Sequence, residues 1–386
     1  MMKRFGIMLV VWFVAFALCP FHVFAEPGVE LAAQARSAVL MDALSGKILF
    51  EKNSHEKLPP ASITKVMTML LIMEALDQGK ISLKDKVRVS EKAATMGGSQ
   101  IFLEPGEEMS VEDMLKAIAV ASANDAAVAM AEHIGGTEEH FVELMNKRAA
   151  ELGLKNTHFQ NSNGLPADNH YSSAHDIAVM SRELLKHPEI TKYTGIYEDY
   201  LRKNSPKPFW LVNTNKLVRF YPGVNGLKTG FTSEARFCLT ATAKRDHMQV
   251  IAVVMGEPDS KIRNKEVSQM LDYAFNQYTN LMVYKKGDLI ARKQVPKGKP
   301  EWVEFRANRP LGLLIRKGED PKSYHKQIIW NNIEAPIKKG QVLGKVQVSK
   351  EGRAVAELEL ISTQDIQKAS MWSNFKKTLR KIFFID

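Results

Sequence analysis

Ser62 and Lys65 begin an apolar segment of the sequence, and their side chains could exchange a proton. Pro59 and Pro60 precede them and an apolar run follows, which is how a helix begins. Apolar residues fall on every face of this helix, so we expect it to be buried. Residues three apart share a helix face, and burial disfavours a charged ammonium. The pattern therefore predicts that Lys65 is a base that activates Ser62 as a nucleophile.

The Ser-x-x-Lys spacing is common, and only its context distinguishes one copy from the others. It occurs four times in the chain, starting at Ser54, Ser62, Ser323 and Ser373. At least three of these matches are accidental, and only the second opens an apolar helix. The alternative interpretation of this copy is a lysine that extends to water beside a serine that caps the helix.

Two further polar motifs follow in unusual surroundings. Ser122 and Asn124 lie in an otherwise apolar helical region, where buried polar side chains need partners. Their alternative interpretation is a cap at a helix boundary. Lys228, Thr229 and Gly230 lead into a strand, and a glycine there lets a ligand approach the strand edge closely. The lysine and the threonine beside it could hold a carboxylate.

Taken in order, the three motifs resemble those of the penicillin-binding protein and serine β-lactamase superfamily. The resemblance is greatest to the low-molecular-mass penicillin-binding proteins that are D-alanyl-D-alanine carboxypeptidases of the peptidase S11 family. It rests on the segments PPASITKVMT, SANDAAVAMAEHIGG, FQNSNGLPADNHYSSAHDIA and GLKTGFT, and extends from about residue 35 to the C-terminus. Within this group, GGSQIFLEPGEEM and FWLVNTNKLVRFYPGVNGLKTG are most similar to the sporulation-associated enzymes of endospore-forming bacteria.

The resemblance implies a reaction and catalytic roles. Ser62 would attack the carbonyl between the last two D-alanines of a peptidoglycan stem pentapeptide while Lys65 takes its proton. Ser122 would relay a proton to the leaving amine, and Asn124 would orient Lys65 and the substrate amide. Water would then hydrolyse the serine ester, with no cofactor and no metal. The same serine would be acylated by β-lactam antibiotics.

The resemblance also implies how the substrate is bound. Lys228, Thr229 and Gly230 would hold the terminal carboxylate at the strand edge. The backbone N–H groups of the nucleophilic serine and of Thr232 would form the oxyanion hole. Arg263 would be a further partner of the carboxylate, and the alternative for it is a surface arginine.

Other functions of the same residues remain open at this point. The chain has Asn163 where family members often have histidine, which leaves the role of that loop undecided. The deacylating pattern Glu-x-x-Leu-Asn does not occur after Asn124, so a penicilloyl ester should persist. That favours a target of penicillin over a β-lactamase or an esterase. A non-catalytic wall-binding protein is a third hypothesis, which the presence of Ser62, Lys65 and Lys228 together opposes.

The elements that must position these residues follow from the chain's periodicity. Residues 37–53 alternate as a β-hairpin, residues 62–185 are mostly helical, and residues 237–256 form two strands before a helix at 261–278. We therefore expect an α/β (α+β) domain over residues 26–280, with an antiparallel sheet assembled from both ends and a helical insertion. By resemblance this is the penicillin-binding, β-lactamase-like transpeptidase fold.

The two ends of the chain predict export and attachment. Residues 1–25 combine basic residues, an apolar run and a small-residue cleavage site, which is typical of a secretory signal peptide. Residues 281–363 alternate in short strands and predict a small β-sandwich-like domain. Residues 364–386 predict a basic amphipathic helix that lies on an anionic membrane, and the alternative is a helix docked on the β domain. We expect the protein at the outer face of the cytoplasmic membrane.

The net charge, the cysteines and the histidines argue against nucleic acid and metal ions as partners. Loss of Lys3 and Arg4 with the signal peptide lowers the formal net charge from +10 to +8, which suits anionic surfaces, and no nucleic-acid-binding motif is present. Cys238 is the one cysteine left after cleavage, so no disulfide or cysteine metal cluster is expected within the chain. Apart from the loose pairs Asp168–His170 and His175–Asp176, five histidines show no metal-ligand spacing with nearby carboxylates and should be solvated or capping: His133, His140, His158, His170 and His175.

Overall fold

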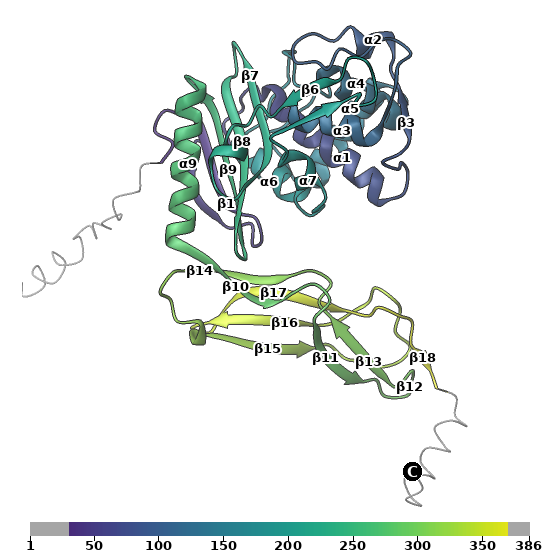
Figure 1. Ribbon diagram of the computed structural model, residues 1–386. Coiled ribbons are helices and arrows are strands. Elements are labelled where there is room, and N and C mark those ends of the chain that lie inside the picture. Colours follow the sequence, from purple (N-terminus) through teal and green to yellow (C-terminus); the bar gives the residue numbers. More distant parts are fainter. Residues whose placement is uncertain (1–30, 370–386) are drawn as a thin grey trace, which may run out of the picture. The chain divides into compact units, whose positions relative to one another are not determined.

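A five-stranded antiparallel sheet is the centre of the first domain of the computed structural model, which describes residues 31–369 (Figure 1). The strand order is β2-β1-β9-β8-β7. Its strands are β1 (Ser37–Asp42), β2 (Ile48–Lys52), β7 (Val224–Thr232), β8 (Arg236–Arg245) and β9 (Met248–Glu257). β1 pairs with β9, with Ala38 opposite Val254. The prediction of a sheet assembled from both ends of the domain is therefore confirmed.

The turn between β1 and β2 shows why the N-terminal hairpin forms. Asp42 ends β1, and its carboxylate accepts hydrogen bonds from both the backbone N–H and the hydroxyl of Ser45. Gly46 follows with a φ of 76°, a left-handed conformation that glycine adopts without steric cost. Every residue of β1 is buried, because helices cover the sheet on both faces and leave no solvated side.

Helices form the layers on either side of the sheet (Figure 1). α9 (Ser260–Gln277) packs on one face and α6 (Ala174–Leu184) on the opposite face. The remaining helices of the domain are α1 (Lys65–Asp77), α2 (Glu91–Ala94), α3 (Val111–Val120), α4 (Asn124–Gly135), α5 (Glu138–Glu151), α7 (Ile190–Thr194) and α8 (Leu217–Phe220). Two small strand pairs accompany them, β3 (Lys86–Arg88) with β4 (Glu108–Ser110) and β5 (Glu198–Leu201) with β6 (Phe209–Val212).

Side-chain caps fix where the main helices begin. The Asp259 carboxylate accepts from the backbone N–H groups of Lys261 and Ile262 at the start of α9. The Ser173 hydroxyl accepts from the N–H of Asp176 at the start of α6. Each cap satisfies N–H groups that have no partner inside the helix, which stabilises a helix by about 1 kcal/mol. The predicted helix at residues 261–278 is thereby confirmed with its start at residue 260.

The second domain is all β, as predicted. A three-stranded sheet of β15 (Tyr324–Trp330), β16 (Val342–Lys350) and β17 (Arg353–Ile361) is joined by the pairs β10–β14, β11–β13 and β12–β18. The paired strands are β10 (Tyr278–Tyr284), β11 (Leu289–Gln294), β12 (Gly298–Lys299), β13 (Trp302–Arg306), β14 (Leu311–Arg316) and β18 (Gln367–Lys368), and a short turn η2 (Pro321–Ser323) precedes β15. Val303, Phe305, Val346 and Leu358 belong to their shared core.

Both predicted limits of this domain need correction. β10 already starts at Tyr278, ahead of the expected boundary at residue 281. Residues 364–369 are not the start of a helix. Ile366 is buried in the β core and exchanges two backbone hydrogen bonds with Ile337, and β18 follows directly. The rest of the predicted amphipathic helix, residues 370–386, and the predicted signal peptide lie outside the described residues. Within residues 31–369, no helix has both the length and the hydropathy needed to cross a membrane.

Candidate active site

Ser62 and Lys65 meet where a short 3-10 turn becomes a helix. Ser62 lies in the turn η1 (Ala61–Thr64), and Lys65 is the first residue of α1. The Lys65 amine lies 3.2 Å from the Ser62 hydroxyl oxygen. Lys65 has no solvent-exposed surface, and most of α1 is buried around it. The interpretation of Lys65 as a side chain that extends to water is therefore wrong.

Lys65 is held by acceptors and not by a counter-ion. Its amine contacts the side-chain oxygen of Asn124 at 2.5 Å and the carbonyl oxygen of Asn163 at 2.7 Å. Burial lowers the pKa of Lys65 well below its usual value, and the charge of Lys228 lowers it further. A neutral amine has two N–H groups and one lone pair. When the amine is neutral, its two N–H groups can serve Asn124 and Asn163, and its lone pair can accept from the Ser62 hydroxyl. When it is charged, its third N–H donates to the Ser62 oxygen.

Ser122 and Asn124 lie at a break between two helices and not inside one. α3 ends at Val120 and α4 begins at Asn124, and Ser122 between them has a φ of 65°. Such a conformation costs a non-glycine residue roughly 1–3 kcal/mol and is typical of functional sites. The Asn124 amide nitrogen donates to the carbonyl of Gly97 at 2.7 Å, which turns its oxygen toward Lys65. The Ser122 hydroxyl makes no hydrogen bond within residues 31–369.

The loop at residues 161–171 contributes a residue to which the sequence assigned no definite role. Asn163 acts on Lys65 through its backbone carbonyl, which has no side-chain signature. Thr68 of α1 donates to the carbonyl of Ser162 at 2.5 Å, and Glu138 of α5 accepts from the Ser162 hydroxyl at 2.7 Å. These two bonds fix the loop against the helices. The loop is therefore a rigid wall of the site.

Gly164 allows this loop to touch the turn that carries Ser62. Its φ is 85°, and a side-chain Cβ at this position would overlap the carbonyl oxygen of Ala61 and lie 2.9 Å from the Thr64 hydroxyl. Any larger residue would have to push the loop, and with it the carbonyl of Asn163, away from Lys65.

His170 supports the same turn, which corrects the expectation of a solvated or capping histidine. It is buried, and its Nδ1 accepts from the backbone N–H of Gln160 at 3.0 Å. Nε2 therefore carries the proton and donates to the Thr64 hydroxyl at 2.8 Å. Burial lowers the pKa of His170 to about 4, so the ring is neutral. Within the described part of the chain, no three His, Cys, Asp or Glu side chains are grouped as a metal site requires.

β7 brings the Lys-Thr-Gly motif alongside Ser62. It is the last strand in the order of the sheet and pairs with β8, with Gly230 opposite Cys238. A Cβ on Gly230 would lie 2.9 Å from the Pro60 carbonyl oxygen and 3.1 Å from the Ala61 side chain. The glycine is needed for this close approach of the turn that carries Ser62, whereas the sequence predicted the approach of a ligand, which stays a prediction. Thr232 lies at the end of β7, where its hydroxyl accepts from the N–H of Ala235 at 3.0 Å.

Lys228 and Thr229 are buried at the strand edge. The Lys228 amine donates to the carbonyl of Thr229 at 3.0 Å, and the Thr229 hydroxyl donates to that of Thr214 at 2.7 Å. Burial lowers the pKa of Lys228 to about 7, and the charge of Arg263 contributes. Thr214 is a partner that sequence analysis did not find, because a lone threonine between β6 and α8 carries no distinctive pattern.

Arg263 is buried, so the alternative of a surface arginine is wrong. It lies on α9, and its guanidinium donates twice to the side-chain oxygen of Asn264, at 3.0 and 3.1 Å. Its charge acts on Lys228 without a direct hydrogen bond between the two residues. The structure thus gathers Ser62, Lys65, Asn124 and the Lys228 region, and leaves Arg263 as an electrostatic neighbour.

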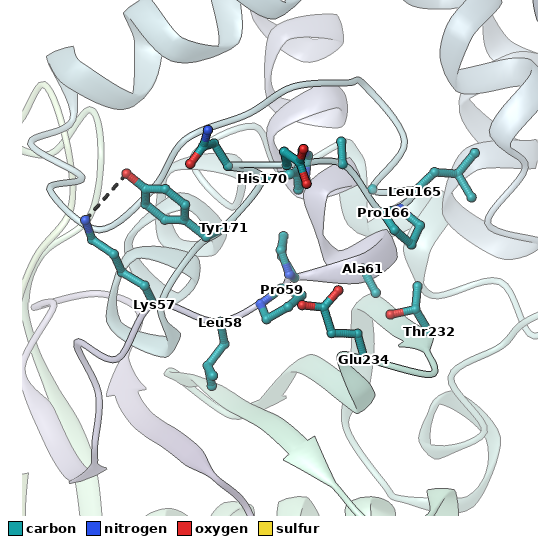
Figure 2. A pocket seen from close by; sticks show the side chains of 15 residues that line it. Lys57, Leu58, Pro59, Ala61, Leu165, Pro166, His170, Tyr171, Thr232 and Glu234 are labelled. Carbon is teal, nitrogen blue, oxygen red and sulfur yellow. Dashed lines mark hydrogen bonds between the residues drawn. The ribbon is translucent and has the colours of Figure 1, made fainter.

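A cavity of about 500 Å³ opens beside η1, the turn that carries Ser62 (Figure 2). Pro60 and Ala61 line it next to Ser62. The loop contributes Gly164 and its neighbours, and the end of β7 contributes Thr232. The cavity therefore lies next to the turn that carries Ser62, although Ser62 itself does not line it.

Comparison with known proteins agrees with this geometry. A family profile described as peptidase S11, D-alanyl-D-alanine carboxypeptidase, matches residues 24–259. The chain belongs to this family. It is a serine-type D-alanyl-D-alanine carboxypeptidase, which decides against the β-lactamase, esterase and wall-binding alternatives. A second profile, the C-terminal domain of penicillin-binding protein 5, matches residues 278–368.

Individual carboxypeptidases and solved structures support the assignment. D-alanyl-D-alanine carboxypeptidase DacF of Bacillus subtilis is 56% identical over 351 residues, 91% of this chain and 90% of the relative. This match supports the narrower resemblance to enzymes of endospore-forming bacteria. Penicillin-binding protein 5 from Haemophilus influenzae superposes with a TM-score of 0.72 at 34% identity, covering 88% of this chain and 98% of that one. Penicillin-binding protein D2 from Listeria monocytogenes, in its cefotaxime-bound form, gives 0.58 at 30% identity, covering 65% and 100%.

The contact between the loop and the nucleophile turn predicts a stability difference between two glycine variants. Gly106 has a φ of 80° and no atom within 4 Å of its would-be Cβ, so Gly106→Ala should lower the free energy of unfolding by about 1–2 kcal/mol through its conformation alone. Gly164→Ala should lower the free energy of unfolding by a further ~1–3 kcal/mol, because its Cβ would overlap the carbonyl oxygen of Ala61. Urea denaturation measures both. Equal losses would show that the loop does not press on the turn.

Proposed function

We propose that Ser62 is the residue that forms the acyl-enzyme and that Lys65 is its general base. The observation that carries this assignment is the set of partners around the Lys65 amine. Two obligate acceptors occupy its N–H groups, and no carboxylate within residues 31–369 forms an ion pair with it. A neutral amine in this setting takes a proton only from Ser62, which makes the serine oxygen nucleophilic.

The substrate side of the proposal uses the edge of β7. The terminal carboxylate of the stem pentapeptide binds at Lys228, Thr229 and Gly230, where its charge raises the population of the Lys228 ammonium. Arg263 adds positive potential from α9. Backbone N–H groups of Ser62 and Thr232 stabilise the oxyanion of the tetrahedral intermediate, a contribution of about 2.7–4 kcal/mol per donor in other enzymes.

Departure of D-alanine completes the first half of the reaction. Ser122 has a free hydroxyl at the break between α3 and α4, from which it passes a proton to the leaving amine. Asn124 keeps Lys65 oriented and offers its amide to the substrate. Ser122 regains its proton from the Lys65 ammonium, so Lys65 is neutral again. Lys65 then takes a proton from the water that attacks the ester and returns it to the Ser62 oxygen as the ester bond breaks. Enzymes of this family act on the cell wall outside the cytoplasm, so the peptidoglycan stem peptide is the substrate.

β-lactams are the expected covalent inhibitors. The Listeria monocytogenes relative is known in cefotaxime-bound and ampicillin-bound forms. A β-lactam ring presents a carbonyl to Ser62 and a carboxylate to Lys228 in the same arrangement as the peptide. The absence of a Glu-x-x-Leu-Asn motif favours a slowly hydrolysed adduct.

Labelling with a fluorescent penicillin tests the assignment of base and nucleophile. Mass spectrometry should locate the adduct on Ser62. Lys65→Arg keeps the charge but has no accessible neutral form, so acylation should slow by about 10²–10⁴-fold. Lys84→Arg, at an exposed lysine, is the matched control and should react at the parent rate. Near-parent acylation of Lys65→Arg would refute the general-base role.

Attachment to the membrane is the remaining part of the proposal. We propose that residues 370–386 hold the exported enzyme on the outer face of the cytoplasmic membrane. The sequence supports this through an apolar stripe with basic residues on other faces: Lys376, Lys377, Arg380 and Lys381. Such a segment binds anionic lipid through both apolar burial and charge.

Truncation after Ala369 tests this anchor and keeps β18 intact. The shortened protein should no longer sediment with anionic vesicles, while D-alanine release from a soluble pentapeptide continues at the parent rate. Full-length protein with neutral vesicles is the control for the charge contribution. Cosedimentation of the truncated protein at the full-length level would contradict the anchor.

A further inference from the structure

We propose that the cavity beside Ser62 is the subsite for the amine-bearing side chain of the stem peptide, and that Asp168 and Glu234 select for that amine. The ligand class is a diamino acid residue placed two positions before the leaving D-alanine. This inference rests on the proposed function, because it takes the scissile bond to lie at Ser62.

The direction of the bound peptide follows from the order of residues along β7. Lys228 and Thr229, which hold the terminal carboxylate, come before Gly230, the residue that touches the nucleophile turn. The acyl part of the substrate must therefore extend the other way, past Thr232 toward Glu234. An extended peptide can follow an edge strand in this manner.

The cavity lies on that acyl side. Thr232 and Glu234 are among the described residues that line it, whereas Lys228 and Thr229 are not. An extended chain advances about 3.3–3.6 Å per residue. The residue two positions before the leaving D-alanine thus lies about 7 Å from it, beyond the reactive carbonyl and beside the cavity. Its side chain is the substrate group best placed to enter.

The charges that line the cavity favour a cation. Asp168 and Glu234 are exposed, and neither carboxylate forms a hydrogen bond or ion pair within the described part of the chain. The opposing cation, Lys57, lies 4.6 Å from the centre of the Tyr171 ring, and its amine donates to the Tyr171 hydroxyl at 3.5 Å. His170 is neutral. An entering ammonium therefore finds two carboxylates that have no other partner.

The labelled residues show the separation of these groups (Figure 2). Lys57 and Tyr171 lie at one side of the cavity, and Thr232 and Glu234 at the other. Glu234 lies in the turn after β7. Its carboxylate can therefore contact a side chain of a peptide that follows this strand. Some diamino acid side chains carry a carboxylate on the same carbon as the amine. Lys57, on the opposite side of the cavity, can bind that carboxylate.

A pair of synthetic pentapeptides tests the subsite. Both end in D-Ala-D-Ala and carry lysine at the third position, either free or acetylated on its side-chain amine. The wild-type enzyme should have a kcat/KM about two- to thirtyfold higher for the free amine, which is the range that two exposed ion pairs contribute together. The double variant Asp168→Asn, Glu234→Gln should bring this ratio close to one. Glu334→Gln, an exposed acid of the β domain, should keep the wild-type ratio.

Charge reversal gives a second readout that loss of folding cannot imitate. Glu234→Lys should raise the relative kcat/KM for a third peptide whose lysine is succinylated and ends in a carboxylate. A wild-type ratio near one, or a double variant that retains the wild-type ratio, overturns the subsite. Penicillin, which lacks the diamino acid, reports on the proposed function separately. Failure of Ser62 to be acylated would overturn that function and this inference with it.

Discussion

The burial of a lysine amine among neutral acceptors is the constraint on which the rest of the site depends. An ammonium at this depth is expensive unless a carboxylate pairs with it, and Lys65 instead meets an amide oxygen, a backbone carbonyl and a hydroxyl. Burial and the nearby charge of Lys228 favour the neutral amine and lower the pKa of Lys65, although the buried Asp125 acts in the opposite direction. The helix break before Asn124 and the loop at residues 161–171 both serve to bring these acceptors to the amine.

Three buried basic side chains lie in this region, and two of them lower the pKa of a neighbour. Lys228 lowers the pKa of Lys65, and Arg263 lowers the pKa of Lys228. In the proposed complex, a substrate carboxylate at Lys228 would offset part of this effect, because it would give the Lys228 charge a partner. Recognition of the terminal carboxylate would then be coupled to the protonation state of Lys65, the proposed base. It suits a substrate that is itself an anion.

Sequence reasoning recovered most of this arrangement where residue type and burial coincide. The apolar surroundings of Lys65 predicted that it is buried, and the three motifs in order predicted which residues lie together. The sequence did not predict the contact between Lys65 and the backbone carbonyl of Asn163, because a residue of any type has such a carbonyl. Thr214 and His170 also act through tertiary contacts that local patterns do not encode. The helix was predicted to begin at residue 364 because Ile366 is apolar in either setting. Its pairing with Ile337 shows that it belongs to the β core.

Direct observation of the lysine charge states is the measurement closest to the central claim. Nuclear magnetic resonance of the side-chain nitrogen in selectively labelled protein, with Lys65→Arg and Lys228→Arg used for assignment, follows each amine through a pH titration. Because burial lowers both pKa values, each amine should lose its proton well below the usual 10.5, with Lys228 doing so at about 7. A neutral Lys65 amine in the resting enzyme at the pH of catalysis is the predicted result. A Lys65 that remains an ammonium up to pH 10 or so would contradict the account.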